Sequence, residues 1–178
     1  MFFPEPVLHR KEVKDVPFLV LLLLLAGAII LQTTVLDYVD VLGIKPDLIM
    51  LIVVLNGFLL GTREGAFLGY AAGILEDLFA GGFIGLNALS KMAAGYLAGM
   101  AGLRLFRENT LVATGVVFLS TFAGNSVYYI LLNMVGIKVP PFYAFFRVII
   151  PVAVYTSLLT PLFFRRIFRF VQLRDRDI

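Results

Sequence analysis

Two adjacent carboxylic acids, Glu76 and Asp77, lie inside an almost wholly apolar stretch, "GYAAGILEDLFAGG". Carboxylates at such a position can exchange protons, bind a cation or pair with a base. Successive helical residues point about 100° apart, which makes this pair unsuited to acid–base catalysis. The chain has no cysteine, and its single histidine, His9, lies in the polar N-terminal tail. These features exclude thiolate chemistry, histidine-based metal sites and a catalytic triad, and the sequence predicts no enzyme, metal or cofactor.

A glycine stripe precedes these acids. Glycines recur at every fourth position, and the next step of four reaches Asp77; the glycines are Gly61, Gly65, Gly69 and Gly73. Residues four apart lie on the same face of a helix. Each glycine inside a helix costs about 1 kcal/mol relative to alanine, so their repetition on one face indicates a use. In membranes, small residues at this spacing let two helix backbones pack closely.

A second set of residues with the same spacing follows, at Lys91, Gly95 and Gly99. We expect the two segments to form an antiparallel hairpin that turns around Ile84. In this register the facing residues are Gly73 with Gly95, Gly69 with Gly99, and Asp77 with Lys91. The hairpin is therefore predicted to hold two layers of glycine and one pair of opposite charges.

The ionisable residues need partners in such a hairpin. A charged side chain at the centre of a membrane costs about 2.5–3.5 kcal/mol on insertion scales. We therefore predict an ion pair between Asp77 and Lys91, and we keep a solvated helix end and an ion or ligand site as alternatives. Glu76 points away from Asp77, and is predicted either to pair with Arg147 or to reach the lipid headgroups.

The composition places most of the chain in a membrane. Of the 178 residues, 60% are hydrophobic and 15% are charged, with a mean hydropathy of +0.95, whereas soluble domains are about 45–50% apolar and about 25% charged. The formal net charge is +3. The basic residues cluster at the ends of apolar runs, which is typical of membrane topology signals and contacts with anionic lipid headgroups. No basic stretch has the interleaved aromatic residues of a nucleic-acid interface.

The apolar runs predict an all-α, polytopic membrane protein with six transmembrane helices. The predicted domain covers residues 18–164, between a tail over 1–17 and a basic tail over 165–178. The first run is too long for a signal peptide and has no small-residue cleavage site, so we expect it to be retained. The basic tail either lies along the membrane surface as an amphipathic helix or runs out into solvent. The predicted spans are 18–36, 46–60, 65–80, 86–103, 110–135 and 142–164.

The distribution of basic residues predicts the orientation. With six spans and a cytoplasmic N-terminus, the inner segments hold eleven lysines and arginines and the outer loops hold two. Inner loops carry this excess of positive charge. Both termini are therefore predicted to lie in the cytoplasm.

The ordered motifs in the first two thirds of the chain resemble the MreD family of bacterial rod shape-determining membrane proteins. The similarity covers "LQTTVL", a "PD" at the start of the second span, the glycine stripe and a "G..GL.AL" pattern. Glu76 departs from the family pattern, in which the acid is at the position of Asp77. The matching residues are Pro46, Asp47, Gly61, Gly65, Gly69, Gly73, Asp77, Gly82, Gly85, Leu86, Ala88 and Leu89.

The resemblance implies a non-enzymatic scaffold of the cell-elongation machinery in the bacterial cytoplasmic (inner) membrane, needed for rod shape and lateral peptidoglycan synthesis. Its implied partner is the bitopic protein MreC, which connects it to the MreB filament and to a glycan polymerase and transpeptidase pair. The family is also similar in fold to the substrate-binding subunits of energy-coupling-factor vitamin transporters.

That second similarity supplies an alternative function, a vitamin-binding transporter subunit. Such subunits dock their partner through an Ala-xxx-Ala pattern on the first helix. Here Ala26 is followed by Ile30, and Ala28 by Gln32, so the pattern is missing. A protein that handles protons or ions through Asp77 is the third possibility.

Overall fold

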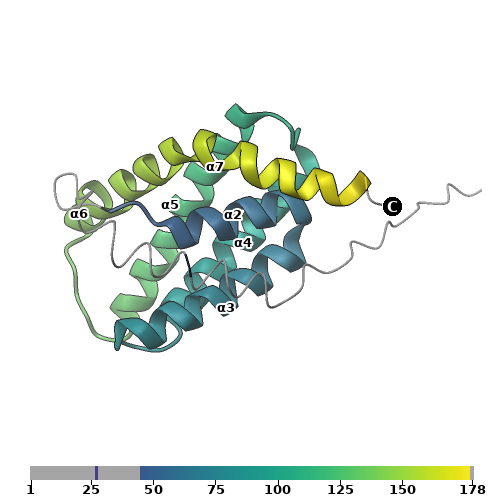
Figure 1. Cartoon of the computed structure of the whole chain (residues 1–178). Coiled ribbons are helices and arrows are strands. Elements are labelled where there is room, and N and C mark those ends of the chain that lie inside the picture. Colours follow the sequence, from purple (N-terminus) through teal and green to yellow (C-terminus); the bar gives the residue numbers. More distant parts are fainter. Residues whose placement is uncertain (1–26, 28–44, 177–178) are drawn as a thin grey trace, which may run out of the picture.

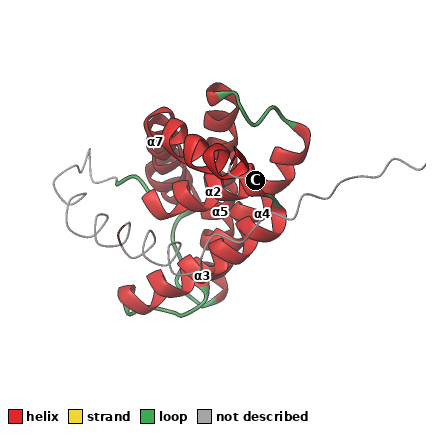
Figure 2. Ribbon diagram, turned by 45° about the vertical axis from the view of Figure 1, so that its right-hand side comes forward, coloured by secondary structure: helices red, strands yellow, loops and turns green. Residues whose placement is uncertain are grey.

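The computed structural model describes Gly27 and residues 45–176. The predicted N-terminal tail and, apart from Gly27, the predicted first span lie outside these residues. Within the described part, the regular structure is entirely helical (Figure 2), in agreement with the predicted all-α class.

Four helices begin and end close to the predicted span boundaries. Asp47 is the N-cap residue of α2, and its side chain accepts a hydrogen bond from the backbone N–H of Met50. Gly61 alone separates α2 from α3, with a φ of 131° that favours glycine. Asn109 caps the next long helix by accepting from the N–H of Leu111. The four helices are α2 (Leu48–Leu60), α3 (Thr62–Ala80), α4 (Leu86–Arg104) and α5 (Thr110–Met134).

The last helical unit is continuous and longer than predicted. It consists of α6 (Pro141–Tyr143), a π-helical segment η1 (Ala144–Ile149) and α7 (Ile150–Arg176). The predicted span ends at Phe164, and the helix continues beyond it through the predicted basic tail as far as Arg176. Phe164, Ile167 and Phe168 pack against the core, so the helix keeps an inward apolar face after its outer face has become basic.

Two of these stretches are long and apolar enough to cross a membrane, Thr110–Met134 and Pro141–Arg169. The apolar helix α2 is shorter, with 13 residues. At 1.5 Å per residue it is about 20 Å long, less than the hydrocarbon thickness of about 30 Å.

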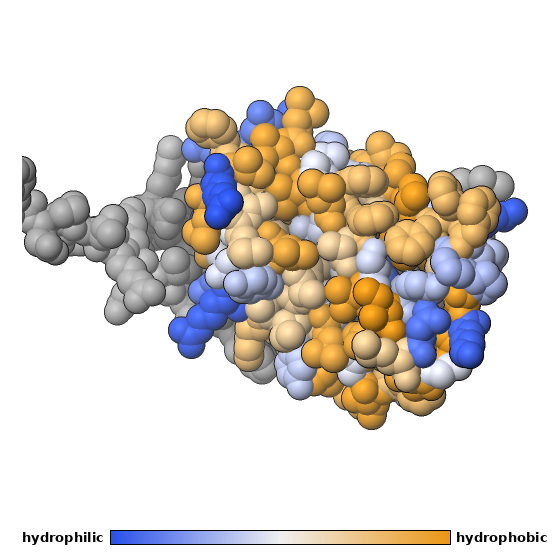
Figure 3. Space-filling view, turned by 180° about the vertical axis from the view of Figure 1, so that it is seen from behind, coloured by the Kyte–Doolittle hydropathy of each residue, from blue (hydrophilic) through white to orange (hydrophobic). Residues whose placement is uncertain are grey.

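Helix α2 forms the centre of the packed core. Ten of its 13 residues are buried, and it contacts α3, α4, α5 and α7, between which it lies in Figure 1. A helix that is apolar on all sides is expected at such a buried position. Many large hydrophobic side chains of the described helices are also exposed on the outside, among them Phe79, Leu111 and Leu119. Figure 3 shows hydrophobic side chains over much of the middle of one face, with most strongly hydrophilic ones toward its left and right ends.

Candidate functional site

Helices α3 and α4 pack backbone to backbone through glycines. A Cβ atom built on Gly65 would overlap the carbonyl group of Gly95, and one built on Gly69 would overlap the carbonyl of Lys91. The helix α2 takes part in the same contact, because a Cβ on Gly57 would also overlap the carbonyl of Gly95. The close approach of the two helices is therefore possible only without side chains at these positions. Gly61 forms the turn between α2 and α3, and its backbone carbonyl carbon, together with Thr62, lies against Gly99.

The register of the hairpin differs from the predicted one. Gly95 lies against Gly65 instead of Gly73, so it meets α3 eight residues earlier than expected. Gly99 lies against Thr62 instead of Gly69, and the partner of Gly73 is Ala88. The last turn of α3 consequently extends past the first residues of α4, and the loop over residues 81–85 folds back to start α4.

Asp77 explains this register because its carboxylate caps the N-terminus of α4. One oxygen, Oδ2, accepts from the backbone N–H of Gly85 at 2.7 Å and of Ala88 at 3.3 Å. The other, Oδ1, accepts from the backbone N–H of Asn87 at 3.1 Å and from its side-chain amide at 2.9 Å. The N-cap residue Gly85 has no side chain with which to cap. Asp77 supplies the missing acceptor from the preceding helix, at the end where the helix dipole favours a negative charge.

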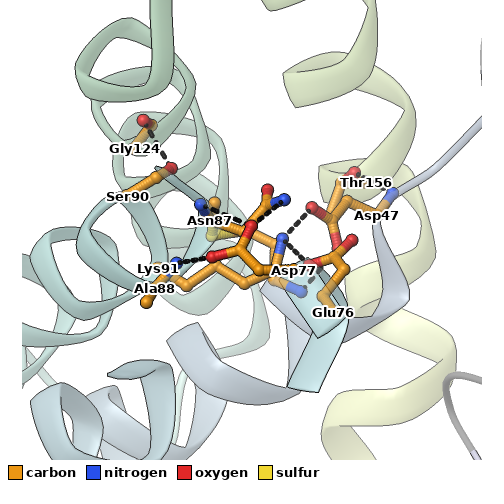
Figure 4. Close-up of polar contacts among 10 residues, drawn as sticks. Asp47, Glu76, Asp77, Asn87, Ala88, Ser90, Lys91, Gly124 and Thr156 are labelled. Carbon is orange, nitrogen blue, oxygen red and sulfur yellow. Dashed lines mark hydrogen bonds and ion pairs between the residues drawn. The ribbon is translucent and has the colours of Figure 1, made fainter. Parts of the chain in front are cut away.

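Lys91 is bound to two other acids. Its Nζ lies 2.7 Å from Oδ2 of Asp47 and 2.8 Å from Oε2 of Glu76, and only 2% of its side chain is exposed (Figure 4). The contact with Asp47 is also a hydrogen bond. The contact with Glu76 has the distance of an ion pair without the angles of a hydrogen bond, since Oε2 of Glu76 has no hydrogen-bond donor. We call Asp47, Glu76 and Lys91 the ion network.

Both predicted ion pairs are therefore wrong. Asp77 uses its two oxygens for the α4 cap and is not paired with Lys91. Glu76 contacts Lys91 instead of Arg147, which lies in η1. Lys91 does pair with a carboxylate of α3, but that carboxylate belongs to Glu76 and not to the neighbouring Asp77.

Asp47 connects the network to three helices. Its Oδ1 accepts from the N–H of Met50 at 2.7 Å and thereby caps α2. Its Oδ2 binds Lys91 of α4, and its own N–H donates to Oγ1 of Thr156 in α7 at 3.0 Å. The preceding residue, Pro46, is buried. The sequence holds a signal for this role, since an acid after proline and before an apolar run is a typical helix start.

Two further residues, Ser90 and Arg107, make polar contacts that connect helices. Ser90 donates to the backbone carbonyl of Gly124 at 2.7 Å and so joins α4 to α5. At the other end of the bundle, Arg107 donates to the carbonyls of Gly102 and Leu59, both at 2.7 Å. These carbonyls lie near the C-termini of α4 and α2, where a cation complements the helix dipole. An open cavity of about 570 Å³ lies beside Arg107, far from the ion network.

The cap predicts the effect of shortening Asp77. In the Asp77→Ala variant the first amides of α4 lose their acceptor, and we expect a loss of about 2 kcal/mol, the upper end of measured N-cap effects. The measurement is thermal unfolding in mild detergent, followed by helical circular dichroism. The matched control is Glu108→Ala, which removes an acid from the α4–α5 loop and should leave the melting temperature unchanged. An Asp77→Ala variant as stable as this control would contradict the capping role.

The comparisons with known proteins give one result. The family model described as rod shape-determining protein MreD matches residues 13–174. No curated protein and no solved structure matches the chain significantly. The match includes all of the glycine contacts, the α4 cap and the ion network.

Proposed function

Because the chain belongs to the MreD family, the non-enzymatic rod shape-determining membrane proteins of the cell-elongation machinery, we propose that it acts as a membrane scaffold for an MreC-type bitopic protein. The scaffold binds the transmembrane helix of that partner. Through the partner it is connected to an MreB-type filament and to the glycan polymerase and transpeptidase pair that builds the lateral wall.

The observation that carries this proposal is that the buried polar groups bind one another and so hold the helices together. Lys91 binds two carboxylates, Asp77 accepts four hydrogen bonds, and Asp47 joins three helices. All of these contacts run between segments of the chain itself. Together with the glycine contacts they support a rigid centre made of α2, α3 and α4, which is what a scaffold requires. In this scaffold the polar groups fix helix positions rather than perform chemistry.

We further propose six spans with both termini in the cytoplasm, arranged as in the substrate-binding subunits of energy-coupling-factor transporters. In this orientation the ion network lies toward the outer side of the membrane, and Arg107 lies toward the cytoplasm. The basic residues at the Arg107 end support the orientation, since inner segments carry the excess of positive charge. The described ones are Arg63, Arg104, Arg107, Arg165, Arg166 and Arg169.

The test is affinity purification of the full chain from mild detergent, followed by mass spectrometry of the proteins that remain bound. We expect an MreC-type bitopic protein, and we expect rod-shaped cells that lose the chain to become round. A control purification uses an unrelated multi-pass protein of the same membrane. Recovery of an ATP-driven transport module, with unchanged cell shape and lost vitamin uptake, would contradict the scaffold and favour the vitamin-binding subunit.

A further inference from the structure

The helix from Pro141 to Arg176 is too long to end inside the membrane. Its length is about 54 Å at 1.5 Å per residue, whereas the hydrocarbon core is about 30 Å thick. One end therefore extends into the headgroup region or beyond. The exposed residues of α7 toward its C-terminal end indicate the surroundings of the helix there.

The outward face of α7 changes from apolar to basic along the helix axis. Val154, Leu158 and Leu162 are 42%, 68% and 69% exposed, and they follow one another at four-residue spacing. The exposed residues of the next turns are Arg165, Arg166 and Arg169. At 100° per residue, all six lie within a sector of about 120°. We call these six residues the α7 lipid face.

The opposite side of α7 fixes this face relative to the bundle. Phe164 is 2% exposed, and Ile167 and Phe168 pack against the core cluster. The rings of Phe164 and Phe168 stack with centroids 5.5 Å apart. The three arginines therefore face away from the described helices and cannot turn toward this core without unpacking α7.

The arginines have no counter-charge within the described part of the chain. Arg165, Arg166 and Arg169 form neither a hydrogen bond nor an ion pair with any residue that the structure describes. The helix has no acidic residue between Ile150 and Arg169. Each guanidinium presents five N–H donors in a planar fork that matches the oxygens of a phosphate group.

We propose that the α7 lipid face binds an anionic phospholipid. The acyl chains lie along Val154, Leu158 and Leu162, and the phosphate group lies against the three arginines. The order of the residues supports a lipid over an acidic protein, because the charges begin within one turn of the last exposed leucine. A phospholipid has the same order, with an apolar part followed directly by an anionic group. This surface is separate from the ion network and does not depend on the scaffold function.

The absence of tryptophan from the chain allows a direct test. In the Leu162→Trp variant the full chain carries one fluorescent reporter beside the arginines. It is reconstituted into phosphatidylcholine nanodiscs that contain either brominated phosphatidylglycerol or brominated phosphatidylcholine, both of which quench tryptophan on contact. An attraction of about 1 kcal/mol per basic residue corresponds to roughly fivefold in binding, so we expect at least about a fivefold preference for phosphatidylglycerol. The Ile130→Trp variant, on the exposed side of α5, serves as the control and should show no preference.

Two variants assign the effect to the arginines. Arg165→Gln, Arg166→Gln and Arg169→Gln are combined on the Leu162→Trp background and should abolish the preference. The same three positions changed to lysine should retain it, and melting temperatures identify any variant that fails to fold. Equal quenching by the two lipids, or a preference that survives the triple glutamine change, would overturn the proposal. So would equal quenching together with arginine-dependent binding of an acidic soluble protein domain, which would assign the surface to a protein partner.

Discussion

Replacing Lys91 by methionine is expected to destabilise the fold by about 3–5 kcal/mol, the cost of removing one partner from a buried ion pair. The variant keeps a side chain of similar length but leaves Asp47 and Glu76 facing one another without a cation. Because Lys91 holds α4 to both α2 and α3, the loss should loosen all three helices together. The measurement is thermal unfolding in mild detergent, with the rod shape of complemented cells as the functional result.

The control for this change is Lys138→Met, at an exposed lysine in the loop before α6. It should leave both stability and cell shape unchanged. Adding Asp47→Asn and Glu76→Gln to Lys91→Met removes the unpaired carboxylates and should recover part of the stability, since the main cost of breaking a buried ion pair is the uncompensated charge that remains. A Lys91→Met variant as stable as Lys138→Met would contradict the structural importance of the ion network.

The second large effect is expected from adding one methyl group at Gly69. Its Cβ would overlap the backbone of Lys91 and Met92, and neither backbone can move without separating α3 from α4. We expect Gly69→Ala to destabilise the protein by about 1–3 kcal/mol, as overpacking of a well-packed core does. The same unfolding measurement tests it.

Gly115 provides a matched control for that change. It lies inside α5, and a Cβ there would meet no atom of residues 45–176 within 4 Å. Gly115→Ala should therefore stabilise the protein by up to about 1 kcal/mol, because alanine is the better helix former. The two substitutions are chemically identical and are expected to have opposite signs. If both raised the melting temperature, the close backbone contact at Gly69 would be refuted.

The sequence predicts the helices between residues 45 and 143 well, because each apolar run there is bounded by residues that end helices. The glycine between α2 and α3, the polar α4–α5 loop and Pro140 before α6 are all visible in the sequence. The sequence places the end of the last span at Phe164 and leaves open whether the basic tail lies along the membrane surface as a helix or runs out into solvent. The structure continues the helix to Arg176, because a basic outer face marks the end of the hydrocarbon, not the end of the helix. The last helix is therefore longer than the part of it that is predicted to cross the membrane.

The register of the α3–α4 hairpin could not be predicted from spacing alone. Two rows of glycine with the same period fit together in several positions, one turn apart. The position is chosen by Asp77, which caps α4 at its first amides. An acid near a helix end can bind either a lysine or the free N–H groups of the next helix, and the sequence does not distinguish between them.

The partners of Lys91 show a similar limit. A lysine in an apolar helix must find counter-charges, so the existence of a buried pair was predictable. One partner, Asp47, lies 44 residues away along the chain, and the sequence marks it only as part of a family motif. The other, Glu76, departs from that motif, and its helical position predicts a different partner, Arg147 or the lipid headgroups. The helix packing that brings these residues together involves α2, which the hairpin prediction did not include.

Lys91 is held by Asp47 and Glu76, and double-mutant cycles measure this coupling. Lys91→Met is combined in turn with Asp47→Asn, Glu76→Gln and Asp77→Asn, and the unfolding free energies of single and double variants are compared. Residues in one ion network show coupling energies of about 0.5–3 kcal/mol. The structure predicts such coupling of Lys91 to Asp47 and to Glu76, with a smaller value for Asp77. Coupling that is largest with Asp77 and zero with Asp47 would contradict the account.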